Sequence, residues 1–305
     1  TRATNGGESG NARLTFGEAM ATHQQSLKDN RNLKPSTIHY WQQIFAALTK
    51  SWPGLKEKEI RRITVGECRG WAAGFARDAS PTRVNNTFAA LRHVFRVALN
   101  AGVIYRDPSA GLTRVRIRAK QLALPSREDF CRLVETIEAG RGRYSRACAE
   151  FVRGLAYTGM RKGEAAGIEW RDLLFAPNEI VVRGDSETGT KNWETRRVPM
   201  IPEARALFTK MRSLRGHEPG TAKVFRVRES QKSIDAACKK LDLARVTHHD
   251  FRHLFATTCI EAGVDIPTVA RFLGHKDGGA LAMKTYGHLR REHGLEQARK
   301  VSFAV

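Results

Sequence analysis

The clearest element of the chain is the stretch SPTRVNNTFAALRHVFRVA, residues 80–98. Ser80 followed by Pro81 is typical of a helix start, because a serine side chain caps free N–H groups and proline fits the first turn. Apolar side chains then recur at spacings of four and three residues, which places them on one helical face: Val84, Phe88, Leu91, Phe95 and Ala98. The stretch therefore predicts an amphipathic helix that buries this stripe.

Further helix signals lie upstream of this stretch. Residues 15–18 and 64–67 both read T-x-x-E, in which the threonine and the glutamate cap each other's backbone N–H groups at a helix start. We therefore expect residues 13–112 to form a helical domain. Residues 1–12 are polar and rich in glycine, and we expect them to be a disordered segment or a tail.

Positive charge dominates the whole chain. Fifty-two Lys and Arg residues stand against 31 acidic residues, which gives a formal net charge of +21. The cations are spread along the sequence, which favours a folded protein that binds a long polyanion over a disordered basic arm. An RNA-binding protein and a simple solubility effect stay open as alternatives at this point. The basic side chains of residues 83–96 are accordingly either a solvated face or a face laid against DNA.

The next segment predicts a linker and a second domain. Residues 113–120, TRVRIRAK, alternate four cations with other residues, and we expect residues 113–124 to be a basic linker that follows a phosphate backbone. A short exposed strand is the alternative. Residues 125–296 predict several helices and two strands, 179–183 and 197–200, joined by a hairpin. The expected fold class is mainly α with a small antiparallel β-sheet.

Other classes of protein are disfavoured by composition. No stretch approaches about 18 uncharged apolar residues, so no membrane-spanning helix is expected. The five cysteines lie apart without a CxxC pair, which indicates reduced thiols rather than disulfides or a zinc site. Cys259 falls in an apolar helical pattern, and we expect it to be buried. We expect neither a cofactor nor a metal, since no cluster of acids suits two-metal catalysis.

Two motifs of the second domain carry groups suited to a phosphate. Residues 158–164, TGMRKGE, predict a tight turn that presents Arg161 at a helix start, where N–H groups and a guanidinium fork bind anions. His249 and Arg252 are three residues apart and share a helical face. Each motif alone is common by chance, so a surface arginine and a fortuitous pair stay open as alternatives.

A third motif and a tyrosine follow. Residues 273–275, LGH, predict a helix end, and Tyr286 comes eleven residues after His275. A tyrosine is usually a packing residue. It becomes a candidate nucleophile where nearby cations stabilise the phenolate and the charge of a phosphate.

The ordered set TGMRKGEAAGIEW, HHDFRH, LGH and Tyr286 resembles the tyrosine recombinases and phage integrases, over residues 13–295. The resemblance implies a helical core-binding domain followed by an α+β catalytic domain, 125–296. Glu164 matches the acidic residue often found after the first arginine of the family. The implied catalytic residues are Arg161, Lys191, His249, Arg252, His275 and Tyr286.

The resemblance also implies a mechanism. Arg161 and Arg252 would hold the scissile phosphate, and His275 would add a hydrogen bond. Tyr286 would form a 3′-phosphotyrosine while Lys191 protonates the leaving 5′ oxygen. His249 would accept the tyrosine proton or position the phosphate.

The expected partners are double-stranded DNA sites, a homotetramer on DNA, and accessory directionality or DNA-bending proteins. We expect a cytoplasmic, bacterial or phage-encoded protein that integrates or excises a mobile element. Residues 297–305 are either a frayed end or a segment that docks on a neighbouring subunit. Alternatives are a transposase, a telomere resolvase, a type IB topoisomerase, or a catalytically silent DNA-binding regulator. The candidate DNA contacts are Lys34, Arg83, Arg92, Arg96, Arg116, Arg118 and Arg197.

Overall fold

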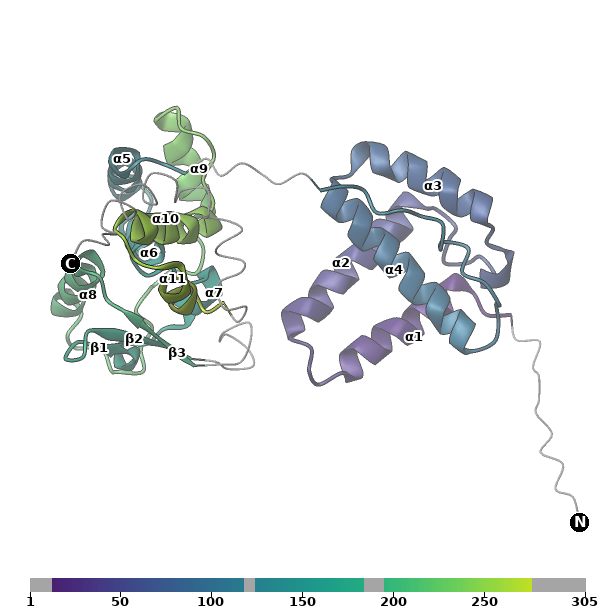
Figure 1. The fold of residues 1–305 in the computed structure, drawn as a ribbon, viewed down its shortest axis with the longest axis horizontal. Helices are drawn as coiled ribbons and strands as arrows, with labels where there is room; N and C mark the ends of the chain where they lie inside the picture. The colour runs from purple at the N-terminus through teal and green to yellow at the C-terminus, as the bar shows by residue number, and fades with distance from the viewer. Residues whose placement is uncertain (1–12, 118–123, 184–194, 276–305) are drawn as a thin grey trace, which may run out of the picture. The chain divides into compact units, whose positions relative to one another are not determined.

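The chain divides into two compact units, with the boundary between residues 120 and 121. The computed structural model describes residues 13–117, 124–183 and 195–275 (Figure 1). Within these residues the structure is mainly helical with one small antiparallel sheet, which confirms the expected fold class. No helix of these ranges combines the length and the apolar character needed to cross a membrane.

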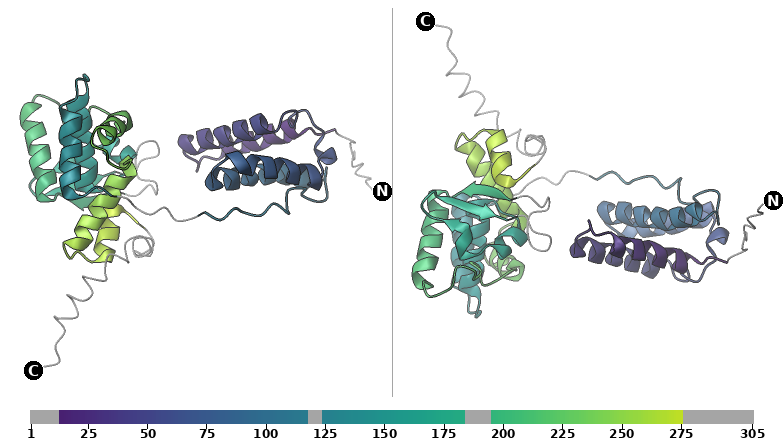
Figure 2. Two further views of the ribbon diagram at one scale, coloured as in Figure 1. Left: turned by 90° about the horizontal axis from the view of Figure 1, so that it is seen from above. Right: turned by 90° about the horizontal axis from the view of Figure 1, so that it is seen from below.

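The first unit is built around the helix predicted from residues 80–98. Its helices are α1 (Phe16–Asp29), α2 (Pro35–Ser51), α3 (Val65–Asp78) and α4 (Pro81–Asn100), with a 3-10 turn, η1 (Ile60–Arg62). The predicted apolar stripe of α4 is buried, and α1, α2 and α3 all pack against α4 (Figure 2). Both predicted capping boxes are formed, at Thr15 and at Thr64, and Ser80 caps α4.

Polar side chains of α4 hold the start of the expected linker against this unit. Asn85 is buried, and its amide both donates to the carbonyl of Val115 and accepts from its N–H, each at 2.8 Å. The guanidinium of Arg92 donates to the carbonyl of Leu112. His93 is half-buried and stacks on His23 rather than lying on a solvated face. Residues 112–115 are therefore anchored to α4.

The second unit is arranged around one buried helix. The helices of this unit are α5 (Arg127–Glu138), α6 (Ser145–Thr158), α7 (Lys162–Gly167), α8 (Pro202–Leu214), α9 (Gln231–Lys240), α10 (His248–Glu261) and α11 (Ile266–Leu273), with the 3-10 turn η2 (Trp170–Asp172). The central helix is α6, and most of its sides are covered, because α5, α8 and α10 pack around it (Figure 2). The helix expected from residue 250, α10, begins two residues earlier, since Thr247 and Asp250 form a capping box.

The sheet of the second unit has three antiparallel strands in the order β1-β2-β3, namely β1 (Leu173–Leu174), β2 (Glu179–Val182) and β3 (Arg196–Pro199). Ile180 pairs with Val198, and both are buried. The two predicted strands are present, with β3 beginning one residue earlier than expected. Strand β1 was not predicted, because two residues are too few to show the alternation of side chains that is typical of a strand. The expected hairpin tip, residues 184–194, lies outside the described residues.

The core of the second unit predicts the effect of a one-methyl change at Gly154. A Cβ atom at this position would overlap the ring of Phe225. We expect Gly154→Ala to lower the free energy of unfolding by about 1–3 kcal/mol, because the core cannot take the added methyl group without shifting. Urea unfolding of the full chain measures the change.

Gly163→Ala is the matched control. Gly163 is an exposed residue of α7, and apart from its chain neighbours and the backbone of α7 no atom lies within 4 Å of an added Cβ. This variant should be as stable as the parent or about 0.5–1 kcal/mol more stable, because alanine favours a helix more than glycine does. Equal stability of the parent and Gly154→Ala would contradict the packing described here.

Candidate active site

A left-handed turn positions the first candidate residue, Arg161. Helix α6 ends at Gly159, whose φ of 61° favours glycine. A Cβ at Gly159 would also overlap the ring of Phe255, so the close approach of α10 requires glycine here. The chain then enters α7 with Arg161 as its N-cap residue. The turn between α6 and α7 therefore places a guanidinium at a helix start, as predicted.

Arg252 is the most buried cation among the described residues of the site. It lies on α10, and the whole residue is 3% exposed. Its two terminal nitrogens donate to the carbonyls of Gly159 and Leu273, both at 2.6 Å. One of them also lies 3.2 Å from Nε2 of His275. Arg252 thus joins the end of α6 to the end of α11, and it brings His275 into the same cluster.

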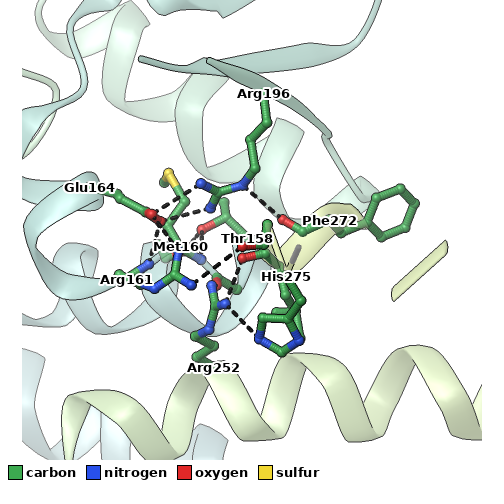
Figure 3. A network of polar contacts seen from close by, with 12 residues as sticks. Thr158, Met160, Arg161, Glu164, Arg196, Arg252, Phe272 and His275 are labelled. Carbon is green, nitrogen blue, oxygen red and sulfur yellow. Dashed lines mark hydrogen bonds and ion pairs between the residues drawn. The ribbon is translucent and has the colours of Figure 1, made fainter. Parts of the chain in front are cut away.

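Three arginine side chains donate hydrogen bonds to successive carbonyl groups at the end of α11 (Figure 3). The carbonyl of Phe272 accepts from Arg196 at 3.1 Å, and that of Leu273 accepts from Arg252. The carbonyl of Gly274 accepts from Arg161 at 3.5 Å. The last carbonyls of a helix have no partner within the helix and carry partial negative charge, so they attract cations.

A single buried carboxylate, that of Glu164, links two of these arginines. Its side chain is 2% exposed and accepts from Arg161 at 2.8 Å and from Arg196 at 2.7 and 3.0 Å. Burial raises the pKa of Glu164, but the hydrogen bonds and charges of Arg196 and Arg161 outweigh burial and lower the pKa to about 2. The network thus contains three guanidinium groups and one carboxylate, and it keeps an excess of positive charge suited to an anion.

Two histidines of α10, His249 and His253, lie on either side of Arg252 in the sequence. The rings of His249 and His253 meet edge to face, with centroids 4.5 Å apart. Burial, and then the charge of Arg252, lower the pKa of His249 below its ordinary value. Burial and the neighbouring His249 lower the pKa of His253 to about 4. Both imidazoles are therefore neutral near pH 7, the form that can accept a proton.

The structure gathers part of the predicted catalytic set. Arg161, Arg252 and His275 share one hydrogen-bond network, and His249 lies one turn before Arg252 on the same helix. Lys191 and Tyr286 lie outside the described residues.

Two residues beside the predicted set, Arg196 and His253, were not predicted as site residues. Nothing in the local sequence of Arg196 indicates a buried partner on α7. His253 had a usable signal, because it is four residues after His249 and shares its helical face.

The candidate DNA contacts have varied surroundings and stay predictions. Arg83, Arg96 and Arg116 are exposed, whereas Lys34 is the half-buried N-cap residue of α2. Arg92 is bonded to the backbone as described above. Arg197 is exposed and pairs with Glu179 at 2.7 Å, and Arg118 lies outside the described residues.

The described residues contain no group of three or more His, Cys, Asp or Glu side chains that could hold a metal ion. Cys259 is buried, as predicted, and burial raises the pKa of its thiol to about 11. Because a thiol with such a pKa is protonated at neutral pH, Cys259 is a packing residue rather than a nucleophile.

Solved structures of low sequence identity share this fold. The Tn1549 transposon integrase in complex with a circular intermediate DNA has a TM-score of 0.72 at 17% identity, covering 94% of this chain and all of that chain. A lambda integrase dimer bound to a COC′ core site has a TM-score of 0.74 at 17% identity, covering 91% of this chain and 79% of that chain.

Sequence comparison gives the family. Tyrosine recombinase XerC of Lactobacillus leichmannii is 23% identical over 288 residues, which cover 88% of this chain and 92% of XerC. The ICEBs1 integrase of Bacillus subtilis (strain 168) is 24% identical over 272 residues, which cover 80% and 72%. The sequence profile of the phage integrase family matches residues 126–293, more than half of the chain. The chain therefore belongs to the phage integrase family, and it is a tyrosine-type site-specific recombinase that cleaves and rejoins DNA.

Proposed function

We propose that this recombinase cleaves a DNA strand by attack of Tyr286 on the scissile phosphate and keeps the strand as a 3′-phosphotyrosine. The observation that carries the proposal is the meeting of Arg161, Arg252 and His275. They come from three distant parts of the sequence and share one network with an excess of positive charge. Such a cluster suits a phosphodiester, whose transition state gains negative charge on the non-bridging oxygens.

The proposed roles follow from the fixed charges. Arg161 and Arg252 donate to the non-bridging oxygens, and His275 adds a further hydrogen bond. A guanidinium stays charged at any working pH and offers several donors in one plane, so it can hold backbone carbonyls and a phosphate together. These groups stabilise the pentavalent transition state, because they are already oriented before the reaction begins.

The bonds exchange in two steps. In cleavage, the bond from Oη of Tyr286 to phosphorus forms and the bond from phosphorus to the 5′ oxygen breaks. Lys191 supplies the proton to the 5′ oxygen, and neutral His249 accepts the proton of the tyrosine. In rejoining, a 5′ hydroxyl of a partner strand attacks the phosphotyrosine and releases Tyr286, so no ATP is consumed. The roles of Lys191 and Tyr286 rest on the order of the sequence motifs.

The proposed substrate is duplex DNA that carries recombination sites, and the proposed assembly is a homotetramer on that DNA. The high net charge supports it, as do solved relatives described as bound to DNA, one of them a lambda integrase tetramer on a Holliday junction. The ICEBs1 and Tn1549 relatives support integration or excision of a mobile element in a bacterial cytoplasm. Accessory directionality or DNA-bending proteins are further proposed partners.

We further propose that residues 297–305 dock on a neighbouring catalytic unit. The segment ends in apolar residues, Val301, Phe303, Ala304 and Val305. The second unit offers an apolar pocket of about 420 Å³, lined by residues that include Phe130, Tyr157, Leu254 and Phe255. Burial of the apolar tail there would join one subunit to the next.

The nucleophile assignment predicts that Tyr286→Phe forms no covalent adduct with DNA. The measurement uses a nicked duplex that traps the cleaved strand, followed by denaturing electrophoresis. Tyr105→Phe is the control, because Tyr105 is an exposed residue of the first unit and should leave adduct formation unchanged. Adducts formed by Tyr286→Phe at the parental rate would contradict the assignment.

The lowered pKa of Glu164 predicts a pH-dependent contribution to stability. A carboxylate whose pKa falls from 4.5 to about 2 on folding stabilises the folded state above pH 4.5, and this stabilisation is lost as the pH falls toward 2. At pH 7 the shift corresponds to about 3 kcal/mol. We expect Glu164→Gln to lower the free energy of unfolding at pH 7 by this order of magnitude.

Denaturant unfolding at pH 7 and pH 3.5 measures this effect. The difference between the parent and Glu164→Gln should be smaller at pH 3.5, because part of the contribution is already lost there. Glu128→Gln, an exposed change at the start of α5, is the control and should have little effect. A difference that is the same at both pH values would contradict the assigned charge state.

The docking proposal predicts that removal of residues 300–305 lowers the fraction of DNA-bound tetramer while affinity for a single site is kept. Phe303→Ala should reproduce part of the loss, and Ser302→Ala is the control. Native electrophoresis of protein–DNA complexes gives the fractions. Unchanged assembly and activity in the truncated protein would remove the docking proposal and leave a frayed end.

A further inference from the structure

We infer that Arg196 is a positioning residue for DNA cleavage, which keeps Arg161 oriented toward the scissile phosphate and its charge available to that phosphate. The inference rests on the proposed role of Arg161 at that phosphate. Arg196 acts through Glu164 and through the end of α11 (Figure 3).

The first link runs from β3 to α7. Arg196 is the first residue of β3, its side chain is 12% exposed, and both of its terminal nitrogens bond to the two oxygens of Glu164. Glu164 in turn accepts from the guanidinium and from the backbone N–H of Arg161, each at 2.8 Å. The position of Arg161 therefore depends on a carboxylate that Arg196 holds from the opposite side.

The second link runs from β3 to the end of α11. Nε of Arg196 donates to the carbonyl of Phe272 at 3.1 Å. Gly274 has a φ of 66° and lies against the Arg196 side chain, so that an added Cβ would be 2.9 Å from Cδ and 3.0 Å from Nε. Gly274, the residue before His275, thus leaves the space that the Arg196 side chain occupies. One side chain orients the turn that carries His275 as well as the carboxylate that holds Arg161.

The charge of Arg196 has its own effect. A buried carboxylate bonded to Arg161 alone would offset much of the positive charge that Arg161 presents to a phosphate. Because Arg196 shares Glu164, part of the charge of Arg161 stays available for an anion. A lysine at this position could not replace it, since one ammonium group cannot reach both oxygens of Glu164 and the Phe272 carbonyl in a single plane.

Single-turnover cleavage by the full-length protein tests the inference. The variants are Arg196→Gln and Arg196→Lys, with a nicked duplex substrate at saturating protein. We expect each to slow adduct formation by about 30- to 100-fold, since a small displacement of a phosphate ligand has effects of this order. Affinity for DNA, measured by fluorescence polarisation, should change less than about 3-fold.

An arginine far from the site offers a matched control. Arg146 lies at the start of α6, opposite the end that carries Gly159, its side chain is 57% exposed, and it pairs with Glu150 at 3.2 Å. Arg146→Gln removes the same charge and should slow cleavage less than about 3-fold. A parental rate in both Arg196 variants, or an equal loss in Arg146→Gln, overturns the inference. If Arg196→Gln fails to fold, the Arg196→Lys variant, which keeps the charge, decides by the same criteria.

A modified substrate distinguishes a positioning role of Arg196 from a general loss of structure in the active site. A methylphosphonate at the scissile position removes a negative oxygen that Arg161 would meet. With it, the gap between the parent and Arg196→Gln should fall below about 5-fold, because a neutral centre needs the arginine less. A gap of the same size on both substrates would show a merely structural role and overturn the inference. Failure of the proposed nucleophile is separate, because Tyr286→Phe decides it without any Arg196 variant.

Discussion

The active-site cluster depends on the unpaired carbonyls at the end of α11. This helix has only eight residues, too few to be stable alone. The carbonyls of its last two residues accept from Arg196 and Arg252, and that of its C-cap residue, Gly274, accepts from Arg161. The three arginines come from a strand, a buried helix and a helix start. The end of α11, which would be unstable in an isolated peptide, therefore connects α11 to β3, α10 and the start of α7. It also concentrates fixed positive charge at one place.

Two left-handed glycines make this convergence sterically feasible. Gly159 ends α6 where α10 comes close, and Gly274 ends α11 where Arg196 crosses it. Each glycine supplies a turn and also leaves room for a neighbouring side chain. Because the acceptors of Arg252 are carbonyls of these two turns and their neighbours, the position of its guanidinium follows from the backbone path.

Local patterns predicted much of the fold, and tertiary contacts explain what they missed. The stripe of α4, the capping boxes and both longer strands follow from spacing within a few residues, and the structure contains them. Three motifs also predicted Arg161, Arg252 and His275, which do meet. Arg196 was missed because its partners lie 32 and 76 residues away. Helix α10 begins earlier than predicted because Thr247 and Asp250 form a T-x-x-D capping box. Val115, which we expected in the linker, is instead bonded to Asn85 of α4.

The site divides the chemistry between two kinds of cation. Arginines cannot release a proton and so provide constant charge, while neutral histidines can transfer protons. Arg252 connects the two functions, because its charge helps to lower the pKa of His249. Burial is the larger cause, so a phosphate that offsets the charge of Arg252 in the proposed reaction still leaves the pKa of His249 below its ordinary value. The imidazole therefore stays neutral while DNA is bound, and it keeps the form that the proposed proton transfer from the nucleophile requires.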